Sequence, residues 1–162
     1  MTTRRAFYSF HYEPDHARAG QVRNMGVIEG NAPATDNDWE SVKRGGDAAI
    51  RRWINDQLSG RSCTIVLIGA KTANRKWINY EIERSWAEGK GIFGVHVHRL
   101  KDLSGNQTDK GSNPFACVTV NGIRLDGLVS VYNPPHSDSK DAYAYIKNNL
   151  ATWIETAIKQ RT

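Results

Sequence analysis

The chain has 162 residues, about the size of one domain, and is long enough to bury roughly two thirds of its unfolded surface. Its 39% hydrophobic content, 24% charged content and five tryptophans exclude a disordered chain, so we expect a single domain over residues 1–162. The 22 Lys and Arg residues outnumber the 17 Asp and Glu residues but are scattered. This surplus suits either an anionic ligand such as a dinucleotide or simple solubility, and we expect no nucleic acid partner.

Cysteine usage and hydropathy favour an intracellular protein. Cys63 and Cys117 each lie in an apolar run, where free cysteines act as small buried hydrophobic residues. Two such cysteines give neither a disulfide framework nor metal-ligand spacing. The basic start is followed by only a short apolar segment, residues 6–10, and no stretch approaches the roughly 20 apolar residues of a membrane span. We therefore expect a cytoplasmic protein without a membrane partner.

The first half of the chain predicts a strand, a helix and a second strand. Residues 5–10 are short and aromatic, which is typical of a strand buried on both faces. From Asp47 to Leu58 apolar residues recur at helical spacing, and Gly60 follows as a helix stop. Residues 62–69 are rich in β-branched side chains, which predicts a central parallel strand covered by helices on both sides.

The second half continues this alternation. An apolar stripe predicts a helix over residues 77–89, and a compact apolar segment predicts a strand over residues 92–97. Residues 101–113 are too polar for a core element and longer than most connections, so we expect a functional or mobile loop. A short strand over residues 128–132 and a terminal helix over residues 141–159 follow.

Alternating strands and helices in one small domain favour a three-layer α/β fold with a central parallel sheet. In such folds, ligands bind outside the carboxyl ends of the strands. The places to look are therefore directly after Phe10, Gly69 and Val97. Aromatic, hydroxyl, amide and carboxylate groups follow the first two of these positions, which predicts a site at that edge.

Glu81 is the candidate carboxylate in this region. It lies one turn above Trp77 on the predicted helix, whereas Glu83 points about 200° away and belongs to the solvated face. Glu81 stands at the border of the buried face, where a carboxylate is costly unless it has a partner or a chemical role. The residues alone leave open both a catalytic role and a salt bridge to the rim of the sheet.

Other polar residues fit structural roles as well as functional ones. Thr72 and Asn74 fit a turn and a helix N-cap. His96 and His98 face the same side of a strand, as two metal ligands would, but no third ligand is evident, so we expect core or rim histidines and no metal. The sequence contains neither GxGxxG nor GxxxxGK[ST], so nothing indicates a Rossmann-type dinucleotide fold or a P-loop.

Several motifs resemble the TIR-like domains of bacterial anti-phage defence, and among them the Thoeris ThsB family. The resemblance covers most of residues 4–116 and rests on Ser9-Phe-His-Tyr12, on the central strand at residues 63–69, and on Asn74-Arg-Lys-Trp-Ile-Asn-Tyr-Glu-Ile82. The W-x-x-x-E-[LI] pattern in the last segment is specific when it follows such a strand and loop.

The resemblance implies a flavodoxin-like fold and an NAD glycohydrolase or ADP-ribosyl cyclase, with Glu81 as the catalytic glutamate. NAD would be the substrate, and no cofactor is implied. The product would be a cyclic ADP-ribose isomer or another ADP-ribose signal that activates an effector on a separate chain. The resemblance places in the nucleotide pocket Phe10, His11, Tyr12, Asn24, Asp36, Trp39, Asn74 and Trp77.

One glutamate is enough for this chemistry. Nicotinamide leaves as a neutral base from its cationic pyridinium form and needs no general acid, unlike the leaving group of an ordinary glycosidase. Glu81 would oppose the positive charge that grows on the ribose, an interaction that strengthens toward the transition state. Phe10, Tyr12 and Trp77 could stack against a base.

Two other functions fit the same sequence. A non-catalytic TIR-like interaction module would form a defined homo-oligomer and turn over no NAD, and exposed aromatic residues such as Trp39 would mark its interface. A nucleoside-processing enzyme would also use a carboxylate against a ribosyl cation, but would accept nucleosides that lack the pyrophosphate.

Overall fold

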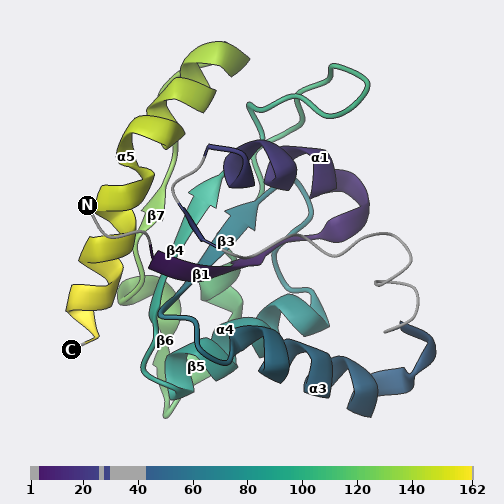
Figure 1. Cartoon of the computed structure of the whole chain (residues 1–162), viewed down its shortest axis with the longest axis vertical. Coiled ribbons are helices and arrows are strands. Elements are labelled where there is room, and N and C mark those ends of the chain that lie inside the picture. Colours follow the sequence, from purple (N-terminus) through teal and green to yellow (C-terminus); the bar gives the residue numbers. More distant parts are fainter. Residues whose placement is uncertain (1–3, 26–27, 30–42, 162) are drawn as a thin grey trace.

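A five-stranded parallel sheet organises the chain. The computed structural model describes residues 4–25, 28–29 and 43–161 (Figure 1). The strands lie in the order β2-β1-β3-β4-β7, and every neighbouring pair is parallel. Their bounds are β1 Arg4–Ser9, β2 Ile28–Glu29, β3 Cys63–Ile68, β4 Gly91–His96 and β7 Val131–Tyr132.

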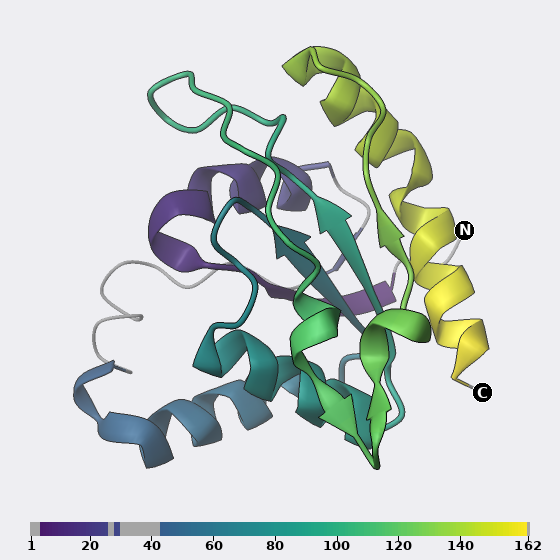
Figure 2. The same cartoon turned by 180° about the vertical axis from the view of Figure 1, so that it is seen from behind.

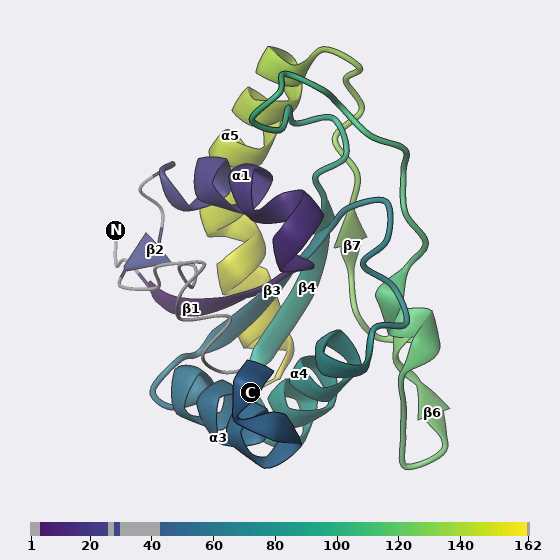
Figure 3. The same ribbon diagram turned by 90° about the vertical axis from the view of Figure 1, so that its right-hand side faces the viewer.

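Helices cover both faces of this sheet. Helices α1 (Tyr12–Arg23) and α5 (Ser139–Gln160) lie on one face, and α3 (Gly46–Leu58) and α4 (Lys76–Ala87) lie on the other. Figure 3 shows the two pairs on opposite sides of the strands. This is the predicted three-layer α/β fold with a central parallel sheet.

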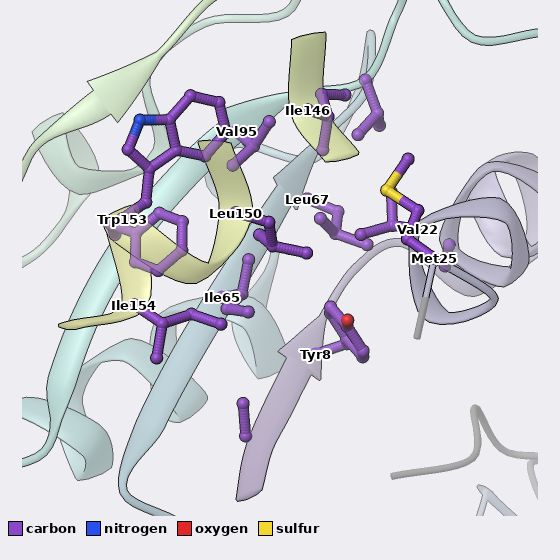
Figure 4. Close-up of a cluster of buried hydrophobic side chains, with 14 of the residues drawn as sticks. Tyr8, Val22, Met25, Ile65, Leu67, Val95, Ile146, Leu150, Trp153 and Ile154 are labelled. Atoms are coloured by element: carbon purple, nitrogen blue, oxygen red, sulfur yellow. The ribbon is translucent and has the colours of Figure 1, made fainter. Parts of the chain in front are cut away.

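The central strand β3 shows why the sheet needs both layers. All six of its residues are buried, and their side chains alternate between the two faces. Ile65 and Leu67 pack toward α1 and α5, whereas Val66 and Ile68 pack toward α4. Figure 4 shows the core between the sheet and helices α1 and α5. The sheet residues meet Val22 of α1, Met25 just after α1, and Leu150 and Trp153 of α5.

Three of the four long helices agree with the sequence predictions. Helix α3 is followed by Gly60, whose φ of +74° is the left-handed conformation that ends many helices. Helix α4 and helix α5 begin and end within a few residues of the predicted bounds. Helix α1 had no sequence prediction, because two of its four buried positions carry the charged residues Asp15 and Arg18.

The chain after Phe115 completes the sheet. A 3-10 helix, η1 (Pro114–Cys117), leads into the antiparallel hairpin of β5 (Thr119–Val120) and β6 (Ile123–Arg124), then η2 (Leu125–Gly127) and the edge strand β7. Figure 2 shows this hairpin at the bottom of the molecule. Strand β7 is shorter than predicted, and α5 then packs against β4.

Two further predictions can be compared with the structure. Cys63 is buried as predicted, but Cys117 is exposed, so the prediction of a second buried thiol was wrong. Cys117 is the last residue of η1, whose buried side chains are those of Pro114 and Phe115. Over residues 101–113 the chain forms neither helix nor strand, as predicted. In the described ranges no helix is long and apolar enough to cross a membrane.

Candidate active site

The carboxyl ends of β1 and β3 place one buried hydroxyl on the face covered by α3 and α4. Phe7 of β1 packs with Ile50 and Ile54 of α3, and Ser9, two residues later, points to the same face. The Ser9 side chain is buried and its Oγ has no hydrogen-bond partner. This hydroxyl lies close enough to Glu81 to lower the pKa of its carboxyl group.

A tight turn after β3 sets the start of α4. The backbone N–H of Gly69 donates to Thr72 Oγ1 at 2.9 Å, and Asn74 adopts a left-handed φ of 63°. Both residues therefore form the turn, as one reading of the sequence predicted. The N-cap reading was wrong for Asn74, because the N-cap of α4 is Arg75, which makes no side-chain capping bond.

Buried hydroxyls fix α4 against the sheet at the level of Glu81. Ser85 Oγ donates to the backbone oxygen of Glu81 at 2.7 Å and lies 2.7 Å from Thr64 Oγ1 of β3. Both hydroxyl residues are fully buried. Ile78 and Ile82 add apolar contacts on the same stripe. The backbone that carries Glu81 is therefore held by packing and by a hydrogen-bonded link to the central strand.

Glu81 is a buried carboxyl group without a cationic partner. It is only 6% exposed, and its Oε2 has no hydrogen-bond partner. Burial raises the pKa of Glu81 from 4.5 to about 8, and the Ser9 hydroxyl acts in the opposite direction. No salt bridge within the described part of the chain includes Glu81, so the alternative of an ion pair at the sheet rim is not realised there.

This environment favours the binding of positive charge. A buried carboxylate without a partner is unstable as an anion and takes up a proton instead. A cation brought into contact with Glu81 would stabilise the ionised form, and the low local dielectric would strengthen that attraction. The geometry thus suits a reaction in which positive charge develops beside the carboxyl group.

Three predicted pocket residues lie together at the end of β1. The rings of Phe10 and Tyr12 stack with centroids 6.1 Å apart, and Tyr12 also stacks on His16 at 5.2 Å. His11 lies between them in the chain and is half-buried. Burial lowers the pKa of His11, and the nearby cations of Arg75, Lys71 and Lys43 lower it further, while Glu13 opposes them. The β1 end of the site is therefore electropositive.

Trp77 lies one turn before Glu81 on α4, as predicted. Its ring is half-buried and meets Tyr80 edge to face at 5.8 Å. It also packs against the core between α3 and β1, with the Lys76 ammonium 4.9 Å from its ring centroid. The indole therefore contributes to the packing of α4 on α3.

Four other residues were predicted to line the nucleotide pocket. Asn74 is exposed in the turn before α4. Asn24 is the C-cap of α1, about 18 Å along the helix axis from Tyr12, and the structure does not bring it together with Glu81. Asp36 and Trp39 lie outside the described residues.

The two predicted core or rim histidines lie at the end of β4 and two residues after it. His96 and His98 are buried, which confirms the core or rim reading, and their ring centroids lie 5.7 Å apart. Among the residues that the structure describes, no group of three His, Cys, Asp or Glu side chains could hold a metal ion.

A second buried carboxylate, Asp15, lies on the other face of the same sheet edge. Asp15 Oδ1 accepts from Arg18 Nη1 at 2.9 Å, and Arg18 also donates to the backbone oxygens of Leu100 at 2.8 Å and Asn106 at 2.9 Å. A Cβ atom at Gly69 would overlap the Asp15 carboxylate. The sequence did not predict this cluster, because its only signal is an acidic and a basic residue three positions apart.

Comparison with known proteins supplies a family. The sequence model described as the TIR-like domain of the Thoeris protein ThsB matches residues 7–102, which is more than half of the chain. A protein of Bacillus cereus (strain MSX-D12) named "Putative cyclic ADP-D-ribose synthase ThsB1" is 42% identical over 117 residues, which are 69% of this chain. The aligned region spans 61% of that protein's length.

Proposed function

The chain belongs to the Thoeris ThsB TIR-like family, and from that premise we propose that it cleaves the nicotinamide N-glycosidic bond of NAD, with Glu81 as the catalytic residue. The observation that carries the proposal is the state of Glu81, which is buried, has no cationic partner and has a pKa raised to about 8. The name of the Bacillus cereus relative supports NAD as the substrate.

The bond that breaks joins C1′ of the ribose to the pyridinium nitrogen. Its electron pair stays on that nitrogen, so nicotinamide leaves as a neutral molecule and the positive charge moves to the ribose. Glu81, ionised by the approach of this charge, stabilises the ribosyl cation more than it stabilises bound NAD. The Ser9 hydroxyl, which lowers the pKa of Glu81, favours the same ionised state.

The cationic rim near His11 suits the anionic part of the substrate. Lys43, Lys71 and Arg75 act on His11 from different segments, so their charges converge near the end of β1. A dinucleotide carries two phosphate charges between its riboses, and converging cations attract such a group. The stacked rings of Phe10 and Tyr12 offer an aromatic surface for a base.

The fate of the ribosyl cation decides the product. Attack by water forms ADP-ribose and releases a proton, whereas attack by a nucleophile of the same molecule closes a ring. The relative's name favours the ring, and we extend the proposal to a cyclic ADP-ribose isomer that activates an effector on a separate chain.

The test is mass spectrometry of NAD incubated with concentrated wild-type protein, Glu81→Gln and Glu83→Gln, alone and in lysate from phage-infected cells. Glu83 is exposed on the same helix and serves as the matched control. We expect wild type and Glu83→Gln to release nicotinamide, and Glu81→Gln to do so at least about a hundredfold more slowly.

Undiminished turnover by Glu81→Gln would refute the role of Glu81. No turnover by wild type in either setting would refute NAD cleavage and favour the interaction module. Turnover of nucleosides that lack the pyrophosphate would favour the nucleoside-processing enzyme. Light scattering would then show whether the chain forms the defined oligomer that an interaction module requires.

A further inference from the structure

A second polar hollow lies at the carboxyl ends of β4 and β7, away from Glu81. It consists of two cavities of about 470 and 490 Å³ that share the lining residues Lys110 and Asn133. Neither cavity is lined by Glu81, Ser9 or His11. Figure 2 shows the loops after β4 and β7 extending from the same end of the sheet, and we call the hollow between them the β4–β7 groove.

The walls of the β4–β7 groove are held together by hydrogen bonds. Gln107 Nε2 donates to the backbone oxygens of Arg99 at 2.8 Å and Ser137 at 2.7 Å, which links the loop after β4 to the segment after β7. The backbone N–H of Thr108 donates to the oxygen of His98 at 3.0 Å. Gly111 packs directly on the backbone of Gly69, so a side chain there would overlap the Gly69 oxygen. The groove is therefore built into the fold.

Two buried imidazoles line the groove without partners. His96 lines one cavity and is 5% exposed, and His98 lines the other and is 4% exposed. The Nδ1 atoms of both rings have no hydrogen-bond partner. Buried polar atoms in folded proteins are paired in the great majority of cases, so two adjacent unpaired imidazoles indicate a place where a ligand supplies the missing partner.

The charges around these histidines are positive. Burial, together with the smaller effects of the Lys110 ammonium and His98, lowers the pKa of His96 to about 4. Burial also lowers the pKa of His98, with added effects of Arg99, Lys110 and Arg18. Asp109 is an acidic residue of the lining, but it is not among the groups that act on either ring. Both imidazoles are therefore neutral N–H donors next to fixed cations.

We propose that the β4–β7 groove is a second ligand site of this protein, which binds a small molecule through a phosphate or carboxylate group. Lys110 supplies the charge, His96 and His98 donate N–H groups, and the Asn133 amide lies between the two cavities. The exposed Pro135 and the half-buried Val131 offer an apolar wall for the rest of the ligand. The volume exceeds that of a simple ion and suits a molecule of mononucleotide size.

The test is NMR of the histidine rings during titration with inorganic phosphate, adenosine monophosphate and succinate. Of the five histidines, His96, His98 and His136 line the groove, while His11 and His16 lie near the end of β1 and report on the other site. We expect the ring signals of His96 and His98 to shift and saturate with at least one probe. Binding by succinate alone would assign a carboxylate ligand, and binding by phosphate or the nucleotide would assign a phosphate.

Two lysine variants make the test specific. Lys110→Met should weaken the affinity for the bound probe about tenfold, the effect of losing one charge-assisted hydrogen bond. Lys101→Met, at an exposed position of the same loop outside the lining, should leave it unchanged. Three results would each overturn the proposal. The first is a shift only at His11 and His16, and the second is an affinity that Lys110→Met does not alter. The third is no shift with any probe. Glu81→Gln should still bind the probe, so this outcome is independent of NAD cleavage.

Discussion

The two buried carboxylates at the carboxyl edge of the sheet differ in what surrounds them. Asp15, on the α1 face, is paired with Arg18, which also holds two backbone oxygens of the loop after β4. Glu81, on the α4 face, has the Ser9 hydroxyl near it and no cation bound to it in the described part of the chain. Burial raises the pKa of both carboxyl groups, but for Asp15 the Arg18 guanidinium opposes that rise.

This difference separates a carboxylate that is paired within the fold from the one for which we propose a catalytic role. Asp15 is paired with Arg18, and Arg18 fastens α1 to the loop after β4, so the pair has a structural role. Glu81 keeps its capacity to stabilise positive charge, because no cation of the described residues is paired with it. Substitutions at Arg18 and Gly69 test the surroundings of Asp15, and substitution of Glu81 tests the unpaired carboxyl group.

The largest expected loss of stability comes from Arg18. Arg18→Met removes a side chain that is 2% exposed, leaves the buried Asp15 without its cation, and removes one donor from the backbone oxygens of Leu100 and Asn106. We expect the free energy of unfolding to fall by about 3–5 kcal/mol. Urea denaturation followed by circular dichroism measures this value. Arg52→Met, at an exposed position of α3, should change it by less than about 0.5 kcal/mol, and equal effects at the two sites would contradict the account.

The next effect depends on pH and concerns Glu81. The pKa of Glu81 is raised from 4.5 to about 8, so between these values the folded protein holds this proton and the unfolded chain does not. The free energy of unfolding contributed by Glu81 therefore falls as pH rises through this window. Glu81→Gln does not titrate, and its stability relative to wild type should rise across the window by at most about 1.4 kcal/mol per pH unit.

Denaturation curves of both proteins at a series of pH values test this expectation. A difference in stability that stays constant from acid to alkaline pH would show that Glu81 is not desolvated in the folded state. If the stability of Glu81→Gln relative to wild type instead fell as pH rises, a cation would have to pair with the Glu81 carboxylate.

A smaller effect is expected at Gly69, where the turn after β3 touches Asp15. A methyl group at Gly69 would overlap the Asp15 carboxylate, which cannot swing away while it is bound to Arg18. Gly69→Ala should therefore destabilise the fold by about 1–3 kcal/mol. Gly20→Ala, in α1 with open space around its Cβ position, should instead stabilise it by about 0.5–1 kcal/mol. Thermal unfolding of the two variants makes the comparison, and a stable Gly69→Ala would contradict the close packing.

The sequence predicted the helices and strands around Glu81 well. The uninterrupted apolar run of β3 and the apolar stripe of α4 are strong periodic signals, and Glu81 was placed at the border of the buried face by helix geometry alone. The family motif then added a role for it. What the pattern could not give was the pairing of Ser85 with Thr64, because hydroxyl residues far apart in the chain carry no sign of their contact.

Helix α1 and the pair of Asp15 and Arg18 could not be predicted from the sequence. Helix α1 buries Asp15 and Arg18. An amphipathic helix is recognised by apolar residues at every third or fourth position, and charged residues at two of these buried positions interrupt that pattern. Two partners of Arg18 are backbone oxygens more than 80 positions away, in a loop whose sequence shows only that it is polar. Tertiary hydrogen bonds of this kind leave no local pattern.

The most direct test of the contrast is a pH titration of the Glu81 carboxyl carbon by ¹³C NMR in the free protein. The account predicts a midpoint of about 8 for Glu81, because burial without a cation disfavours its charge. A midpoint near the ordinary value of 4.5 would show a carboxylate that is solvated or paired, and would contradict the claim that Glu81 is held ready for positive charge on the nicotinamide ribose.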